Sequence, residues 1–367
     1  MSATSTSSAA SDPRSTSETR AAVSAPVSAR IPLLVTGIGL IVVVVLSTAI
    51  GPADVSLWTV IQVLLSHIPL LHFHSAASNS VTNQGIVWDI RLPRVILGGL
   101  VGAMLAAGGA SYQGVFRNPL ADPYLLGVAA GAGLGATIVI VANSGSTALL
   151  PIAAFIGGAG AVTLTYLVGA RFGGRSSGAS IVLAGIAVAA IFTAAQTFLQ
   201  QQHAQDLQAV YSWILGSLSL ATWSDVWLVV PYLLVSTVVL LAHRRLLDVL
   251  RLGEEEASSL GINPQRIRLI VVAAATLGTA AAVSVSGLIG FVGIIVPHVV
   301  RRTTNASYRV VMPVSIVAGA AFLILADLVA RTIESPAEVP LGVITAFVGG
   351  PFFIFVLRSR RAHEGVL

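Results

Sequence analysis

The sequence predicts an all-α, polytopic membrane protein with about ten membrane-spanning helices, and three observations support this. Of its 367 residues, 55% are hydrophobic and only 10% are charged, whereas roughly 25% are charged in a typical soluble domain. Apolar runs of about 20 residues recur along the chain, and each can cross a hydrocarbon core of about 30 Å as a helix. The arginines are concentrated in alternate connections between these runs, as the positive-inside rule requires.

The composition also excludes several kinds of protein. All 20 basic residues are Arg, so the chain lacks the Lys of a P-loop and carries no standard ATP-binding motif of its own. It has no Cys, which excludes a disulfide framework, a zinc-thiolate site and a cysteine nucleophile. The net charge of +5 comes without the polar surface that a nucleic-acid-binding patch needs.

The elements follow in order. Residues 1–30 are rich in Ser, Ala and Thr and are expected to form a disordered tail. Ile31 to Ile50 is the first expected membrane helix, because it is longer and further from the start than a typical signal peptide. Further spans are expected at about 95–115, 124–142, 148–170, 180–201, 223–242, 266–286, 287–300, 311–330 and 340–357. The eighth contains three glycines and a proline that shorten or break it. Residues 51–90 and 202–222 are expected to be loops or interfacial helices.

Counting arginines gives an orientation. If the N-terminus is cytoplasmic, 17 arginines lie inside and three lie outside, which favours an even number of spans. The outer three are Arg91, Arg94 and Arg331. All five Trp fall on or near the same outer side, as an interfacial belt would place them. The 35 glycines cluster within the spans, where small residues allow close helix packing.

The three outer arginines are candidate binding residues because they break the charge rule. Pro93 favours an extended residue before it and suits the first turn of the helix that follows, so Arg91 and Arg94 are expected at a membrane mouth. Arg331 follows Asp327 at the i, i+4 spacing, which lets the carboxylate hold the guanidinium. Snorkelling explains a single arginine, but three together favour a shared anionic partner.

The polar segment at about 246–263 is the second candidate site. Gly253 precedes three glutamates in what would be the first turn of a short helix, where the helix dipole favours carboxylates. Gly261 can end that helix in a left-handed conformation, and Asn263 can cap the next helix. A structured hairpin of this kind has the form of a docking knob, although acidic runs also mark plain solvated faces.

Weaker candidates lie elsewhere. Asn118-Pro119 and Ser176-Ser177-Gly178 stand at inner helix ends, where turn chemistry explains them equally well. His298 has no second ligand at metal spacing on its segment, and His67, His72 and His74 form only a loose loop cluster. No metal site is therefore predicted.

Six motifs together resemble the FecCD-type permeases, the membrane subunits of type II ABC importers for iron-siderophore complexes, haem and cobalamin. The motifs are Arg91-Leu-Pro-Arg94, Asn118 to Gly127, Leu252-Gly253-Glu254 to Leu260-Gly261, Gly287 to Gly293 with Pro297-His298, Ala326-Asp327 with Arg331, and Pro340-Leu-Gly342. The resemblance runs from about residue 31 to the C-terminus.

The resemblance implies a BtuC-like permease fold that pairs with a second copy or a close paralogue. It implies that the outer arginines receive acidic residues of an extracytoplasmic substrate-binding protein, and that two ATP-binding subunits dock on the cytoplasmic segment. The implied ATPase-coupling residues are Leu252, Gly253, Glu254, Ala257, Leu260 and Gly261. The implied inner gate comprises Asn118, Pro119, Leu120, Ser177 and Gly178.

In this interpretation the chain is not an enzyme and binds no cofactor, since ATP and Mg²⁺ act through the partner ATPase. It lies in the cytoplasmic (inner) membrane of a bacterium or archaeon with both termini inside. An iron-siderophore complex is the favoured cargo, with cobalamin or haem as alternatives. A secondary transporter would place ionisable groups near the bilayer midplane, where Asp327 is the nearest candidate. An exporter permease would give the outer arginines no role.

Overall fold

The structure is a computed structural model that describes residues 29–53, 55–67, 80–142, 149–172, 178–304 and 306–364. Its regular elements in these ranges are all helical, which confirms the expected fold class. The expected tail falls almost wholly on residues 1–28, outside the described ranges, as do His72, His74 and Ser177.

The α-helices are α1 Arg30–Ala49, α2 Leu57–Ser66, α3 Val81–Gln84, α4 Leu92–Val115, α5 Val128–Ala142, α6 Leu150–Phe172, α7 Gly178–Gln202, α8 Leu207–Ile214, α9 Trp223–Leu250, α10 Glu254–Ser259, α11 Pro264–Ser286, α12 Val292–Thr303, α13 Tyr308–Thr332 and α14 Leu341–Glu364. A π-helix, η1, covers Gly85–Arg91, and short 3₁₀ turns cover Pro123–Leu126 (η2) and Ala204–Asp206 (η3).

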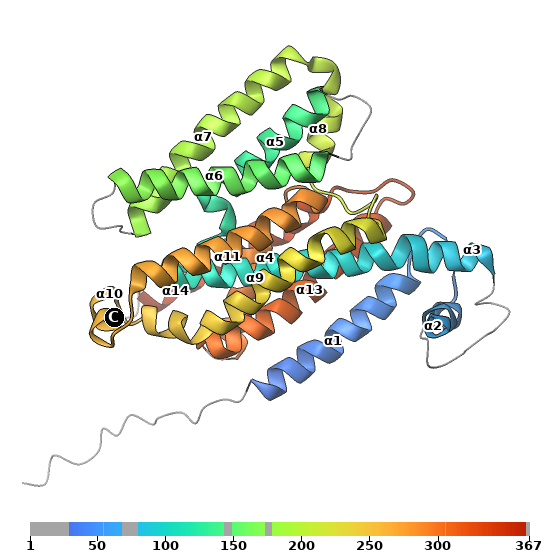
Figure 1. Cartoon of the computed structure of the whole chain (residues 1–367). Coiled ribbons are helices and arrows are strands. Elements are labelled where there is room, and N and C mark those ends of the chain that lie inside the picture. The colour runs from blue at the N-terminus through green and yellow to red at the C-terminus, as the bar shows by residue number, and fades with distance from the viewer. Residues whose placement is uncertain are drawn as a thin grey trace, which may run out of the picture.

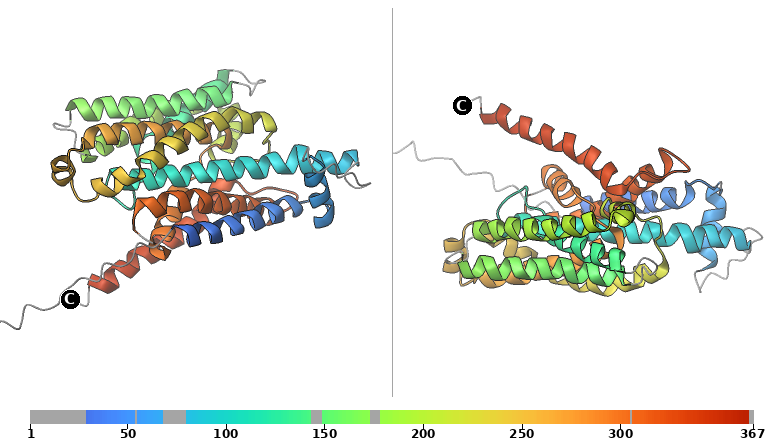
Figure 2. Two further views of the ribbon diagram at one scale, coloured as in Figure 1. Left: turned by 60° about the horizontal axis from the view of Figure 1, so that its bottom comes forward. Right: turned by 90° about the horizontal axis from the view of Figure 1, so that it is seen from above.

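The long helices form layers around α4. Figure 1 shows α4, α9, α11 and α13 in the middle, with α5, α6, α7 and α8 on one side and α1 on the other. Helix α4 contacts α13, α11, α9 and α12, whereas α5, α6 and α7 pack mainly on one another and α6 joins them to α11. Helix α14 contacts α12 and α13 and diverges from the bundle toward its C-terminal end (Figure 2). Most of α4 is buried, so it is the central helix of the fold.

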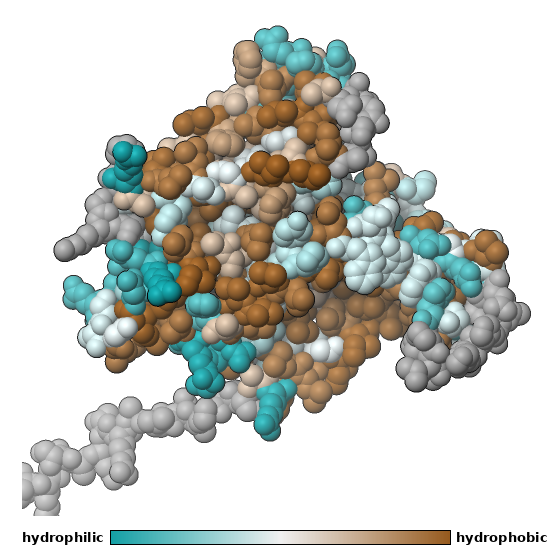
Figure 3. Space-filling model, viewed as in Figure 1, coloured by the Kyte–Doolittle hydropathy of each residue, from teal (hydrophilic) through white to brown (hydrophobic). Residues whose placement is uncertain are grey.

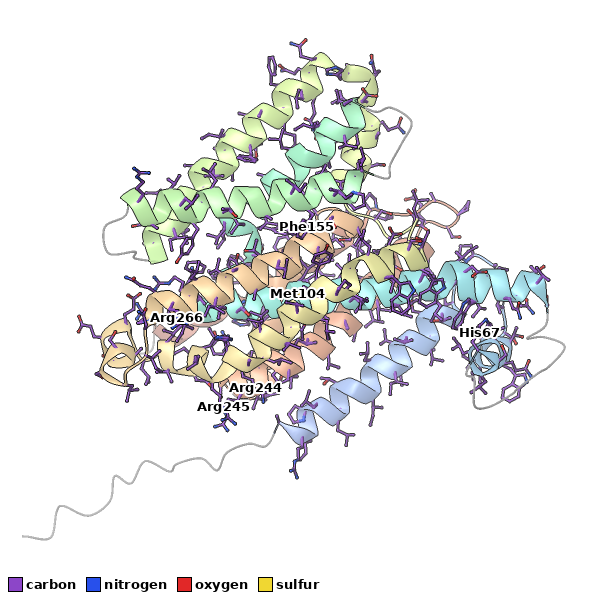
Figure 4. All side chains as sticks on the ribbon, viewed as in Figure 1. His67, Met104, Phe155, Arg244, Arg245 and Arg266 are labelled. Atoms are coloured by element: carbon purple, nitrogen blue, oxygen red, sulfur yellow. The ribbon has the colours of Figure 1, made fainter. Side chains whose placement is uncertain are left out.

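The bundle has two ends, named here the α10 end and the α2 end after the short helices that lie there. Figure 4 shows Arg244, Arg245 and Arg266 toward the α10 end and His67 at the α2 end. The flanks between the ends are largely apolar on the face shown in Figure 3, while polar side chains gather toward the ends. This banded surface is the one expected for a protein whose flanks face lipid.

Each of the ten expected spans coincides with a helix. Within the described residues, seven helices are long and apolar enough to cross a membrane alone, whereas α5 and the apolar part of α14 are shorter. Glycines allow close packing at the centre, as predicted. A methyl group on Gly109 would overlap the backbone of Gly293 in α12, and one on Gly102 would overlap that of Gly319 in α13.

The start of the second span is a correction. Pro93 does not follow an extended residue: Leu92 is helical, with φ −66° and ψ −46°. One apolar helical run extends from Val81 to Val115, and η1 joins α3 to α4 within it. The Leu92 N–H donates to the Val87 carbonyl five residues earlier. This wider hydrogen-bond pattern lets the chain enter α4 as a continuous helix through a proline at its first turn.

The eighth span is the second correction. Helix α12 begins at Val292, not at 287, and it follows a non-helical stretch at 287–291. Gly287 ends α11 with φ +69° and ψ −163°, a backbone conformation that favours glycine, and Phe291 precedes α12 in the left-handed conformation with φ +69°. Helix α12 has only 12 residues, so it rises about 18 Å, well short of a hydrocarbon core of about 30 Å.

Candidate functional site

The three predicted outer arginines lie in one buried cluster at the α2 end. Arg91 ends η1, Arg94 lies in the first turn of α4, and Arg331 lies in the last turn of α13. Their exposed fractions are only 4%, 8% and 3%. Buried cations of this kind need partners, because a desolvated charge without hydrogen bonds is strongly destabilising.

Arg94 is held by two carboxylates. Its Nε donates to both Asp327 carboxylate oxygens at 3.1 and 3.0 Å, and its Nη2 donates to Oδ1 at 2.8 Å. Its Nη1 and Nη2 also donate to Glu338 at 2.6 and 3.0 Å. Charge-assisted, multidentate pairs of this kind fix the guanidinium plane as well as its position.

Arg331 and Arg91 connect the cluster to the end of α1. Arg331 Nε lies 3.7 Å from Asp327 Oδ2, which confirms the predicted i, i+4 pair, and its Nη2 donates to the hydroxyl and carbonyl of Ser47. Arg91 Nη1 donates to the carbonyls of Thr48 and Ala49 at 3.0 and 2.7 Å. The cluster therefore joins α1, α4 and α13 at one point.

The arginines thus meet, but their guanidinium groups are engaged within the chain. The sequence indicated Asp327 as a partner from its spacing, whereas Glu338 was missed because it lies 244 residues from Arg94 and no local pattern links them. Within the residues that the structure describes, Asp327 and Glu338 are the carboxylates that pair with Arg94 and Arg331. Their role in docking a binding protein is a proposal taken up below.

The predicted knob at the α10 end is present in the expected form. Helix α10 carries three glutamates in its first turn, Gly261 has φ of +78°, and Asn263 caps α11 by accepting from the Arg266 N–H at 3.1 Å. Gly253 also has positive φ, +142°. Ala257, within α10, is fully buried, so α10 is anchored to the bundle.

Two large apolar side chains flank α10 and face outward. Leu252 is 64% exposed and Leu260 is 62% exposed. Glu254, by contrast, turns back and forms an ion pair with Arg268, which is buried in α11. Asp248, near the end of α9, accepts hydrogen bonds at 2.7 Å from the Ser307 hydroxyl and the Tyr308 N–H at the start of α13. The knob is therefore tied to α9, α11 and α13.

The candidate inner-gate residues lie beside the knob. Asn118 accepts a hydrogen bond from the Leu120 N–H at 3.0 Å, which closes a tight turn after α4. Gly178, at the start of α7, lies against Phe116, since a methyl group there would approach the Phe116 ring at 3.3 Å. A cavity of about 570 Å³ is lined by residues that include Asn118, Gly178, Glu254 and Arg268. The structure thus brings gate and coupling candidates to one cavity.

Several polar side chains beside this turn were not predicted as site residues. Burial raises the pKa of Asp122 to about 6, although the hydrogen bond it accepts from the Tyr124 N–H at 2.8 Å opposes the rise. The Tyr124 hydroxyl exchanges hydrogen bonds with the backbone of Ile289 at 3.1 Å, and Gln113 donates to the Gly293 carbonyl at 3.1 Å. These contacts join the turn after α4 to the break before α12.

The described residues contain no group of three or more His, Cys, Asp or Glu side chains placed to hold a metal ion. His298 packs edge-on against Phe352, and His67 stacks on Trp88 at 3.7 Å between ring centroids. Trp88 in turn lies against Trp223, which places part of the predicted Trp belt together at the α2 end.

The model of the FecCD transport family matches residues 39–359. The chain belongs to the FecCD transport family. A cobalamin import system permease protein, BtuC of Halobacterium salinarum, is 38% identical over 355 residues, covering 89% of this chain and 95% of its own. The hemin transport system permease protein HmuU of Yersinia pestis is 40% identical over 302 residues, covering 78% and 88% of the two chains.

A solved structure supports the same assignment. The inward-facing conformation of a metal-chelate type ABC transporter matches with a TM-score of 0.78 and 28% sequence identity, covering 90% of this chain and 99% of its own. The predicted resemblance is therefore confirmed, and this FecCD protein is a multi-pass permease component of an ABC importer. Within that assignment, the arginine cluster, the knob and the gate turn are its candidate working parts.

Proposed function

We propose that this permease carries an iron-siderophore complex or a related metal chelate across the cytoplasmic membrane, with cobalamin and haem as the alternative cargoes. Family membership and relatives named for cobalamin and hemin support this range of cargo. The chain forms the route and performs no covalent chemistry. It needs no cofactor of its own, because ATP and Mg²⁺ act on separate ATP-binding subunits.

The α10 end is the cytoplasmic end in this proposal, and the ATPase docks on the knob. The strongest support for this docking site is the pair of exposed leucines, Leu252 and Leu260, that flank the anchored six-residue helix α10. Exposed apolar side chains on a rigid polar surface are typical of protein contacts. Because Glu254 pairs with the buried Arg268, and both line the cavity beside Asn118 and Gly178, a push on α10 reaches the gate directly.

The α2 end is the outer end, and the substrate-binding protein docks there. The three arginines of the cluster and the one-third exposed Glu338 side chain lie at this face. Docking carboxylates would then compete with Asp327 and Glu338 for the three arginines. Two permease copies, or this chain and a paralogue, would supply one cluster for each lobe of the binding protein. Helix α14, with Phe347 largely exposed, supports such a pairing.

Uptake by a reconstituted complex tests the proposal. Proteoliposomes that contain the permease, its ATPase and its binding protein should accumulate a ferric chelate only when ATP is present. The permease alone should hydrolyse no ATP. Uptake driven by a proton or sodium gradient without ATP would instead establish a secondary transporter and refute the proposed function.

A further inference from the structure

One face of α12 is only partly covered by the rest of the bundle. Ile294, His298, Arg301 and Arg302 fall on one side of this helix and retain exposure, whereas Val292, Gly293, Ile295, Val296, Pro297 and Val300 are buried. The non-helical stretch just before α12 also borders open space, because a methyl group on Gly290 would meet no atom within 4 Å. Non-helical backbone at membrane depth is tolerated where it is buried in protein or lines a water-filled cavity.

This face leads into a pocket at the α10 end. The pocket has a volume of about 330 Å³ and lies between α12, α14 and the turn after α4. Its lining is Pro119, His298, Val299, Arg301, Arg302, Thr303, Phe352, Phe355 and Val356. It therefore combines an aromatic and aliphatic wall with a cationic rim, and it includes Pro119 of the candidate gate. We name it the α12–α14 pocket.

The two arginines of the pocket have no anionic partner among the residues that the structure describes. Arg301 donates from Nη2 to the Tyr308 hydroxyl at 3.0 Å and lies 5.2 Å from the Tyr308 ring centroid, which holds the guanidinium in place. Within the described part of the chain, neither Arg301 nor Arg302 has a carboxylate at ion-pair distance, and Arg301 Nε has no hydrogen-bond partner. Arg94 and Arg268, by contrast, both have carboxylate partners.

We infer that the α12–α14 pocket is an exit-side passage site that favours anionic chelates, with Arg301 and Arg302 meeting the anionic groups and Phe352 and Phe355 meeting the apolar body. This inference rests on the proposed function and narrows its cargo to a chelate with carboxylate, catecholate or similar anionic groups. A neutral corrinoid gains nothing from the two uncompensated charges. Desolvating unpaired arginines around a neutral body instead costs free energy.

The absence of Cys from the chain allows a direct test in the full-length protein. Thr303→Cys places one thiol in the pocket, and purified protein in detergent is reacted with an anionic and a cationic methanethiosulfonate reagent. Two nearby cations attract the first and repel the second, so the ratio of the anionic to the cationic reagent's rate should be about ten-fold higher at low salt than the same ratio for a free thiol such as 2-mercaptoethanol. Ferric citrate should slow the modification, and cyanocobalamin at the same concentration should not.

Matched variants locate the effect. Adding Arg301→Gln and Arg302→Gln to Thr303→Cys should bring the two reagent rates close together and remove protection by ferric citrate. Adding Arg244→Gln and Arg245→Gln, another adjacent arginine pair toward the α10 end, should leave both effects in place. Ser258→Cys on the acidic α10 should show the opposite reagent preference.

Three outcomes would overturn the inference. A ratio of the two reagent rates at Thr303→Cys equal to the ratio for a free thiol such as 2-mercaptoethanol would show that the pocket is not cationic. Equal protection by inorganic phosphate and ferric citrate would reduce it to a site for any small anion. Phosphatidylglycerol nanodiscs could also protect the thiol of Thr303→Cys from modification. If phosphatidylcholine nanodiscs gave no such protection, and ferric citrate did not change it, the pocket would be a lipid site. The uptake experiment separates these failures from failure of the proposed function, since ATP-driven uptake can persist whichever outcome the pocket gives.

Discussion

Asp327→Asn should be the most destabilising single change at the α2 end, because Asp327 neutralises the centre of the arginine cluster. Its carboxylate is 2% exposed, accepts three hydrogen bonds from Arg94 and lies 3.7 Å from Arg331. Asparagine keeps the shape but removes the charge, leaving Glu338 as the carboxylate that pairs with Arg94 among the described residues. Breaking a buried ion pair in this way costs about 3–5 kcal/mol.

Thermal unfolding of the purified protein in detergent, followed by tryptophan fluorescence, measures the effect. For a chain of this size a loss of about 3–5 kcal/mol lowers the Tm by on the order of 5–10 °C. Glu338→Gln should cost only about 1 kcal/mol, because its side chain is one-third exposed and water screens the lost charge. Glu334→Gln, on the same connection but exposed, is the matched control and should leave the Tm unchanged.

A Tm for Asp327→Asn equal to that of Glu334→Gln would refute the reasoning, since the cluster would then contribute nothing to the stability of the fold.

The burial of the same cluster also determines which variants can test docking of the binding protein. Reversing the charge of Arg91 or Arg94 would place carboxylates among buried carboxylates and carbonyl groups, so lost binding would follow from misfolding. Glu338→Gln is the sharper test of docking, because it removes a competing anion from the outer face without removing an arginine.

Three further outcomes are expected. Gly109→Ala should destabilise the protein by about 1–3 kcal/mol through overlap with Gly293, whereas Gly37→Ala on the open side of α1 should not; equal melting temperatures would contradict the close packing. Asp122 binds its proton more tightly when folded, so the free energy of unfolding of the wild type should fall by about 3 kcal/mol as pH rises from about 4 through 6, and Asp122→Asn should abolish this trend; identical pH profiles would exclude it. Leu260→Asp should leave the free energy of unfolding within about 0.5 kcal/mol of wild type yet reduce co-purification of the ATPase at least about ten-fold; normal co-purification would remove the knob from the interface.

The fold was predictable to the extent that it depends on local rules. Runs of apolar residues located a helix for each of the ten expected spans, because a membrane helix must satisfy its backbone internally and needs no distant partner to be recognised. The turn chemistry of the knob was equally local, since Gly261 and the Asn263 cap act on their own neighbours. Both features were therefore visible from single segments of sequence.

The features that were missed depend on contacts between distant segments. The π-helix of η1 has no propensity signature, and it is the reason that Pro93 lies within a continuous helix. Glu338 and Ser47 reach Arg94 and Arg331 across 244 and 284 residues, so nothing in the local pattern identified them. Burial of the three arginines follows from these partners. Composition alone suggested exposed cations because it does not show which acids fold back onto them.

The two ends of the bundle differ in how their charges are satisfied, and this difference bears on alternating access. At the α2 end, ion pairs and carbonyl contacts join α1, α4 and α13 into one buried unit. At the α10 end, a cavity separates the gate turn from the knob, and Arg301 and Arg302 lack carboxylate partners within the described residues. A ligand shifts a conformational equilibrium only by its differential affinity for the two states. An anionic chelate that reaches the α10 end supplies charge that the chain itself does not, whereas at the α2 end it must displace Asp327 or Glu338. The weaker internal ties therefore lie at the end where the ATPase is proposed to act.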